Sequence, residues 1–224
     1  FMSEDGVPGA AVGMVDEGRV VYANGFGVAS LADPTQPVTR DTVFHLASVT
    51  KTFVATAVMQ LVERRQLSLD APIVTYLPYF RVADARSRDI TIRQILTHTS
   101  GLPDVEDYGW DRPEYDDRAL ERYLRSLTTL TLRAAPGATY AYSNLAFEVL
   151  GDVVAKASRT PFEDYVQKEI LEPLQMTSST LLYHGVTRQA WAAGHTRTAS
   201  GGMTVIPTYP YNRPHAPSST LHSS

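Results

Sequence analysis

The stretch "FHLASVTKTFVATAVMQLVERRQL", residues 44–67, places a serine before a long apolar-faced segment and a lysine three residues after that serine. Apolar residues recur in it at intervals of three and four, which is the spacing of one helical face. They are Val49, Phe53, Val54, Ala57, Val58, Leu61 and Val62. The pattern predicts a helix that starts at Val49 and has Ser48 as its N-cap.

Ser48 and Lys51 would share one face of this helix, so that their side chains can meet. A serine hydroxyl becomes a good nucleophile when a neighbouring base takes its proton, and an amine can be that base where burial or nearby cations disfavour its charged form. Backbone N–H groups at a helix N-terminus can also stabilise an oxyanion. Taken alone, however, the pair is more typical of plain structure than of catalysis, because serine is a common N-cap and lysine a good helix former.

A second motif, "YAYSN" at residues 140–144, follows a Pro136-Gly137 turn and precedes an apolar helical stripe. A phenol beside a serine–lysine pair can relay protons to a leaving group, and an asparagine amide can bind an amide or ester carbonyl. These residue types also pack and cap in ordinary turns. We predict that the Ser48 hydroxyl, the Lys51 amine and the Tyr142 phenol converge within hydrogen-bonding reach.

The two motifs together, "SVTK" at 48–51 and "YSN" at 142–144, resemble those of the serine β-lactamase and penicillin-binding-protein superfamily. The Tyr-x-Asn form is similar to the branch of class C β-lactamases, D-alanyl-D-alanine carboxypeptidases and family VIII esterases. The resemblance extends over nearly all of the chain. It includes the stretches "ITIRQILTHTSGLPD", "PGATYAYSNLAFEVLG", "ILEPLQMTSST" and "RPHAPSSTLHSS".

This resemblance implies an α+β fold of the β-lactamase/transpeptidase type, with an antiparallel sheet flanked by helices, a mostly helical lobe and an active site in the cleft between them. It implies that Ser48 is the acylated nucleophile and Lys51 its proton acceptor or electrostatic partner. Tyr142 would be the general acid and base, and Asn144 a ligand of the substrate carbonyl. The spacing of Tyr140 to the asparagine departs from the motif, so we expect Tyr140 to serve packing.

The predicted organisation is a single incomplete catalytic domain over residues 1–224. Residues 1–70 would form the sheet hairpin and the nucleophile helix, 71–180 the helical lobe, and 181–224 return loops. The family's third motif, Lys-Thr-Gly or His-x-Gly, is not found, and Tyr183-His184-Gly185 has the wrong spacing and comes too early. We therefore expect that the C-terminal strands are missing and that the chain is the first two thirds of a domain.

Shorter patterns predict the other elements. Residues 9–15 and 19–23 read as a β-hairpin around the turn Asp16-Glu17-Gly18, and Asn24-Gly25 reads as a second turn. Further helices are predicted around residues 90–98, 117–127, 145–157 and 162–171. Acidic and aromatic residues at 104–118 and Gly, Pro, Ser and Thr at 199–224 predict loops.

Composition excludes several classes of protein. The net charge of −4 argues against a nucleic-acid partner. The longest apolar stretch, 53–62, is shorter than the ~18 residues that a membrane span needs. The six histidines lack zinc-site spacing and there is no cysteine, so we expect no metal and no cofactor. Phe1 in place of an initiating Met predicts a trimmed N-terminus; the compartment, exported or cytoplasmic, and the oligomeric state stay open.

The sequence therefore predicts a serine hydrolase that forms an acyl-enzyme on a small-molecule or peptide substrate: a β-lactam, a D-alanyl peptide or a carboxylic ester. The absent third motif motivates the alternative of a catalytically inactive, penicillin-binding-like sensing or binding module. A Ser-His-Asp triad using His98 or His195 also stays open, because triads are defined in space. We otherwise expect His98 to make a hydrogen bond that fixes its own loop, "THTSGL".

Overall fold

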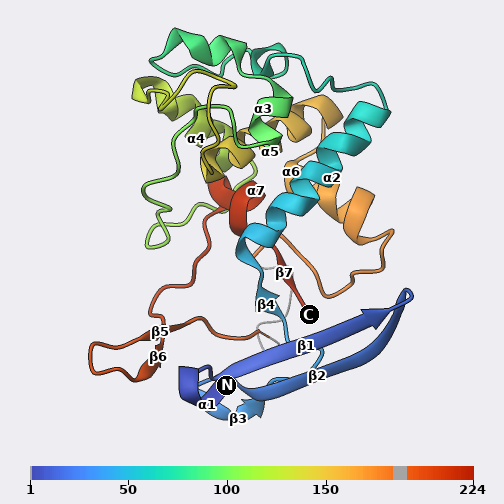
Figure 1. The fold of residues 1–224 in the computed structure, drawn as a ribbon, viewed down its shortest axis with the longest axis vertical. Coiled ribbons are helices and arrows are strands. Elements are labelled where there is room, and N and C mark those ends of the chain that lie inside the picture. The colour runs from blue at the N-terminus through green and yellow to red at the C-terminus, as the bar shows by residue number, and fades with distance from the viewer. Residues whose placement is uncertain (1, 184–190) are drawn as a thin grey trace. The chain divides into compact units, whose positions relative to one another are not determined.

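The computed structural model describes residues 2–183 and 191–224, and the chain divides into two compact units. The first unit holds the strands and contains the described residues of Phe1–His45, Ser178–Pro210 and His222–Ser224. The second unit, Leu46–Thr177 with Tyr211–Leu221, is helical (Figure 1). Strands and helices are thus segregated along the chain, as the α+β prediction requires.

The strand unit is built on an antiparallel sheet of order β1-β2-β3. The bounds are α1 Met2–Asp5, β1 Gly9–Asp16, β2 Arg19–Ser30, β3 Asp33–Pro37, β4 Phe44–His45, β5 His195–Arg197, β6 Met203–Val205 and β7 His222–Ser223. β4 pairs with β7, and β5 with β6. The predicted hairpin is confirmed: β1 and β2 join at Glu17 and Gly18, whose φ angles of 46° and 74° suit the turn that matches strand twist.

The second predicted turn, Asn24-Gly25, is wrong, because both residues lie inside β2. Gly25 is needed there for a different reason. A Cβ atom on Gly25 would lie 2.2 Å from the carbonyl oxygen of Val38, so that only glycine allows the two main chains to approach this closely. The Asn-Gly pair thus marks a close backbone contact within a strand.

The helical unit is centred on α5, which packs against α2, α3, α4, α6 and α7. Its α-helices are α2 Thr50–Glu63, α3 Ile92–Leu96, α4 Ala119–Ser126, α5 Asn144–Ser158, α6 Phe162–Val166 and α7 Ala216–Ser219. Its shorter turns are η1 Ala47–Val49, η2 Ile73–Thr75, η3 Ala85–Asp89, η4 Leu127–Thr129, the π-helical η5 Gln167–Leu171 and η7 Arg213–His215. No helix in the described parts of the chain has both the length and the apolar content to cross a bilayer.

Local signals explain where the main helices begin. At α5, Ser143 is the N-cap, and its Oγ accepts the Ala146 N–H at 3.0 Å. The helix ends at Ser158, and its C-cap residue Arg159 takes the left-handed conformation. At α3, Thr91 and Gln94 form a capping box. The helices predicted near residues 90–98, 117–127, 145–157 and 162–171 are therefore present, some of them shorter than expected.

Two predictions about local structure are wrong. Ser48 is not an N-cap: it lies in η1, and α2 begins at Thr50 after Val49, which makes no side-chain cap. The segment 199–224 is not only loop, since it contains β6, η7, α7 and β7. These elements span two to four residues each, too few to display a period, so tertiary contacts hold them.

Candidate active site

Ser48 lies at an exposed bend of the main chain just before α2. The preceding residue, Ala47, has φ of 44°, a left-handed conformation that is unfavourable for a residue with a Cβ atom. Thr50 holds this bend, because its Oγ1 donates to the Ala47 carbonyl at 2.6 Å and accepts the Leu221 N–H at 3.0 Å. The Ser48 hydroxyl is thus presented by a constrained backbone rather than by a helical cap.

Lys51 lies on the first turn of α2 and is only 7% exposed. Its Nζ donates to Ser48 Oγ at 3.1 Å, to Asn144 Oδ1 at 2.6 Å and to the main-chain carbonyl of Ser218 at 2.8 Å. An ammonium has three protons, so these acceptors satisfy it fully. In a neutral amine the two N–H bonds can stay on Asn144 and Ser218, and the lone pair then faces Ser48.

Tyr142 approaches from the segment that precedes α5. Its hydroxyl donates to Ser48 Oγ at 2.9 Å, and its ring centroid lies 5.0 Å from Lys51 Nζ. The structure therefore brings the lysine amine and the phenol each within hydrogen-bonding distance of the Ser48 hydroxyl. What each group does in a reaction stays a prediction.

Asn144, the first residue of α5, is held by Asp104. Asp104 Oδ1 accepts from the Asn144 backbone N–H at 2.8 Å and from its Nδ2 at 3.0 Å. This orients the amide so that its oxygen faces Lys51, and one Nδ2 proton is left for a further acceptor. The predicted role of Asn144 as a ligand of the substrate carbonyl would have to use that proton.

His98 supports the second motif. Its Nδ1 accepts the Ser143 N–H at 3.2 Å, and its ring lies 4.5 Å from that of Tyr142 between centroids. Burial, followed by the charge of Lys51, lowers the pKa of His98 below its ordinary value of 6.5, which keeps Nδ1 free to accept. The expected hydrogen bond of His98 exists, and its partner belongs to the "YSN" motif.

Two further expectations concern Tyr140 and a Ser-His-Asp triad. Tyr140 is 70% exposed, but its ring meets that of His98 edge-on with 5.9 Å between centroids, so its packing role stays a prediction. The triad alternative gains no support, because the hydrogen-bond partners of Ser48 Oγ in the described chain are Lys51 and Tyr142. His195 lies in β5, where its Nε2 accepts the Leu31 N–H at 3.1 Å.

Two groups at this site were not predicted from the sequence. Asp104 falls in the acidic segment predicted as a loop, yet it closes the "THTSGLPD" stretch and its carboxylate orients Asn144. The second is the Ser218 carbonyl, a main-chain atom that no residue type can signal. Within residues 2–183 and 191–224, no group of three His, Cys, Asp or Glu side chains could hold a metal ion.

The chain is similar to known serine hydrolases in sequence. The beta-lactamase family model matches residues 1–224. Esterase EstB of Burkholderia gladioli is 38% identical over 184 residues, which are 75% of this chain and 45% of the esterase. The D-alanyl-D-alanine-carboxypeptidase/endopeptidase AmpH of Escherichia coli strain K12 is 32% identical over 177 residues, 78% of this chain and 46% of AmpH.

The fold prediction is confirmed by solved structures. The octameric penicillin-binding protein homologue from Pyrococcus abyssi superposes with a TM-score of 0.83 at 29% identity, over 100% of this chain and 51% of that chain. The chain spans about half the length of the curated relatives it matches.

Proposed function

Because the chain belongs to the beta-lactamase family, we propose that it is a serine hydrolase that acts through an acyl-enzyme on Ser48. The observation that carries this proposal is the contact of one exposed hydroxyl, Ser48 Oγ, with both Lys51 Nζ at 3.1 Å and Tyr142 OH at 2.9 Å. Covalent acyl transfer needs a nucleophile that an adjacent base can activate, and either of these groups lies close enough to Ser48 Oγ to exchange a proton with it.

In acylation, Ser48 Oγ would attack the substrate carbonyl carbon while its proton passes to Lys51 or Tyr142. Backbone N–H groups beside Ser48 would stabilise the oxyanion. When the tetrahedral intermediate collapses, the bond from carbon to the leaving group breaks, and Tyr142 delivers the proton to that leaving group. The products are the Ser48 ester and the protonated leaving group.

In deacylation, a water oxygen would attack the ester carbonyl and give up its proton to the Tyr142–Lys51 pair. The carbon–Oγ bond then breaks, and Ser48 recovers its proton. Carboxylic esters, D-alanyl peptides and β-lactams share the first half of this cycle. Two relatives, an esterase and a D-alanyl-D-alanine-carboxypeptidase/endopeptidase, support the first two substrate classes.

The direct test is covalent labelling of Ser48. The protein is incubated with a fluorophosphonate or a fluorescent penicillin, and intact-mass and peptide mass spectrometry then locate the adduct. We expect one adduct, on Ser48. The matched variant Ser48→Ala should take no label and should lose turnover of a nitrophenyl ester by a factor on the order of 10⁶.

Other outcomes would contradict the proposal. An adduct on a different serine would identify that residue as the nucleophile in place of Ser48. Wild-type turnover in Ser48→Ala would contradict the proposed mechanism. Failure of every probe to label the folded protein would favour the alternative of a non-catalytic binding or sensing module.

A further inference from the structure

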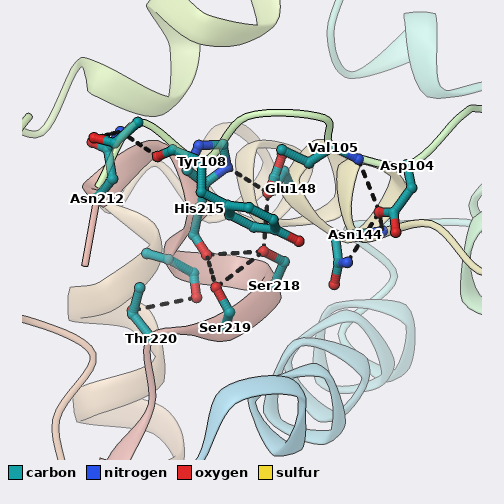
Figure 2. Close-up of polar contacts among 12 residues, drawn as sticks. Asp104, Val105, Tyr108, Asn144, Glu148, Asn212, His215, Ser218, Ser219 and Thr220 are labelled. Carbon is teal, nitrogen blue, oxygen red and sulfur yellow. Dashed lines mark hydrogen bonds and ion pairs between the residues drawn. The ribbon is translucent and has the colours of Figure 1, made fainter. Parts of the chain in front are cut away.

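Glu148 is a buried carboxylate that the steps above do not use. It lies on α5, one helical turn after Asn144, and is 0% exposed. Its Oε1 accepts a hydrogen bond from Ser218 Oγ at 2.9 Å and lies 2.7 Å from His215 Nδ1. Its other oxygen, Oε2, is buried and has no hydrogen-bond partner among the described residues. Figure 2 shows the side chains of Glu148 and Ser218 pointing toward each other.

Stability alone explains this group poorly. Removing a carboxylate from water costs free energy, and Glu148 Oε2 has no hydrogen bond among the described residues to offset that cost. Even well-paired buried charges add little net stability, and apolar residues of similar volume often do as well or better. The position of the contacts is therefore more informative than their energy.

These contacts lead to Lys51 through a single residue. The hydroxyl of Ser218 binds Glu148, and the main-chain carbonyl of Ser218 accepts from Lys51 Nζ at 2.8 Å. Ser218 lies on α7, which has only four residues and includes Pro217, so α7 has few hydrogen bonds of its own to hold it in place. His215, at the N-cap of α7, is also held by Glu148.

We propose that Glu148 is a positioning residue for acylation, which acts through Ser218 to hold a main-chain carbonyl on Lys51 Nζ. The inference rests on the proposed function of Ser48 and Lys51. A neutral amine has two N–H bonds and one lone pair. When Asn144 Oδ1 and the Ser218 carbonyl accept the two N–H bonds, the lone pair of the amine points at Ser48 Oγ. If the Ser218 carbonyl moves away, the amine can rotate, and its lone pair no longer points at Ser48.

The test compares acylation rates at saturating probe, a quantity that is separate from probe affinity. Glu148→Met keeps the volume but removes the acceptor, and we expect acylation of Ser48 to slow by about 10- to 100-fold. Glu148→Gln keeps an acceptor oxygen for the Ser218 hydroxyl, so it should stay within about threefold of wild type. A residue that only stabilised the fold would not give this pattern in folded protein.

The matched control is Glu163→Met. Glu163 is also a buried carboxylate that anchors the C-terminal segment, through Arg213 in η7, with Oε1 2.8 Å from Nε. The hydrogen bonds described for Glu163 go to Arg213, and none of them joins Glu163 to Ser218. We expect Glu163→Met to lower stability while the folded protein keeps its acylation rate within about twofold. Equal slowing in Glu163→Met and Glu148→Met would overturn the inference.

Ser218→Ala provides a second route if Glu148→Met folds poorly. It keeps the carboxylate and removes only the hydroxyl, and we expect acylation to slow by about three- to tenfold. Combined with Glu148→Met it should add no further loss, because both changes break the same link. A wild-type rate in Ser218→Ala would overturn the inference.

The two proposals can fail separately. Absence of labelling in the wild-type protein contradicts the proposed function. Labelling at equal rates in wild type and Glu148→Met contradicts only the role of Glu148. A crystal structure of Glu148→Met in which the Ser218 carbonyl stays within hydrogen-bonding distance of Lys51 Nζ would contradict that role whether or not the protein turns over substrate.

Discussion

Helix α5 and the β1–β2 hairpin are both rich in apolar residues, but they differ in what covers those residues. In α5, ten successive residues from Leu145 to Val154 are buried. In β1, six of eight residues are exposed, and in β2 the side chains of Val20 and Val21 are 70% and 59% exposed. The apolar pattern of the sequence thus predicted both elements, but it did not predict that α5 is buried while the hairpin is exposed.

The two units also differ in which of them contains the candidate active-site residues. Ser48, Lys51, Tyr142 and Asn144 all belong to the helical unit. A buried amine or carboxylate needs several neighbours to satisfy its hydrogen bonds, and only elements that pack on all sides supply them. The helical unit has that packing around α5, which suits it to hold Lys51 and Glu148.

The largest contrast should come from removing one hydroxyl in each unit. Tyr142 and Tyr22 are equally exposed, at 41%. Tyr142→Phe removes the group that donates to Ser48 Oγ, and we expect ester turnover to fall by about 10²- to 10⁴-fold with little change in stability. Tyr22→Phe is the control and should keep the wild-type rate. Comparable activity in Tyr142→Phe would assign the proton relay to Lys51 alone.

The same polar substitution should separate the two regions by stability. Val153 in α5 is 0% exposed, and Val20 in β2 is 70% exposed. Val153→Thr buries a hydroxyl and should cost about 1–3 kcal/mol in free energy of unfolding, whereas Val20→Thr should stay within about 0.5 kcal/mol. Urea denaturation measures both values. Similar costs would mean that the hairpin face is covered in solution.

A pair of glycines tests how closely α7 approaches α5. A Cβ atom on Gly151 would lie 2.0 Å from Pro217 Cγ, whereas one on Gly13 in β1 would meet nothing within 4 Å. Gly151→Ala should cost about 1 kcal/mol, because overpacking of about 1–3 kcal/mol exceeds the gain of up to about 1 kcal/mol in helix propensity.

The functional consequence of Gly151→Ala is the sharper part of this prediction. Since Pro217 precedes Ser218, the displaced helix should also slow acylation of Ser48. Gly13→Ala should change neither property. Wild-type acylation in Gly151→Ala would show that the Ser218 carbonyl tolerates movement of α7.

The smallest expected effect is a pH dependence that resides in the helical unit. The pKa of His98 is lowered in the folded state, so the unfolded chain takes up its proton first. This contribution to stability is complete above the unfolded value of about 6.5 and is lost as the pH falls through the folded pKa. His98→Asn keeps an acceptor for the Ser143 N–H and tolerates the φ of 54° at this position. The free energy of unfolding should depend less on pH between about 8 and 5 in this variant. If the pH dependence of the free energy of unfolding is the same in His98→Asn and wild type, groups other than His98 cause it.

Much of the fold could be read from local patterns. The hairpin around residues 16–18 and the helices at α2 and α5 follow from turn residues and from apolar periodicity. The errors fall where tertiary contacts override local rules. Gly25 is required by the close approach of the Val38 main chain and not by a turn. Helix α7 is held by tertiary contacts rather than by helix propensity.

The candidate site shows the same division. Residue types and family resemblance indicated Ser48, Lys51, Tyr142 and Asn144, since these side chains carry recognisable chemistry. Asp104 could have been found, because it ends a stretch that already showed the resemblance.

The sequence by itself determined the local elements and the reactive side chains, because turn residues, helical spacing and functional groups are properties of neighbouring residues. Only the tertiary structure decided which groups surround Lys51. Its acceptors on Asn144 and Ser218 lie 93 and 167 residues away along the chain, and one of them is a main-chain carbonyl that every residue possesses. No local pattern encodes such a contact, because it forms only when α2, α5 and α7 pack together.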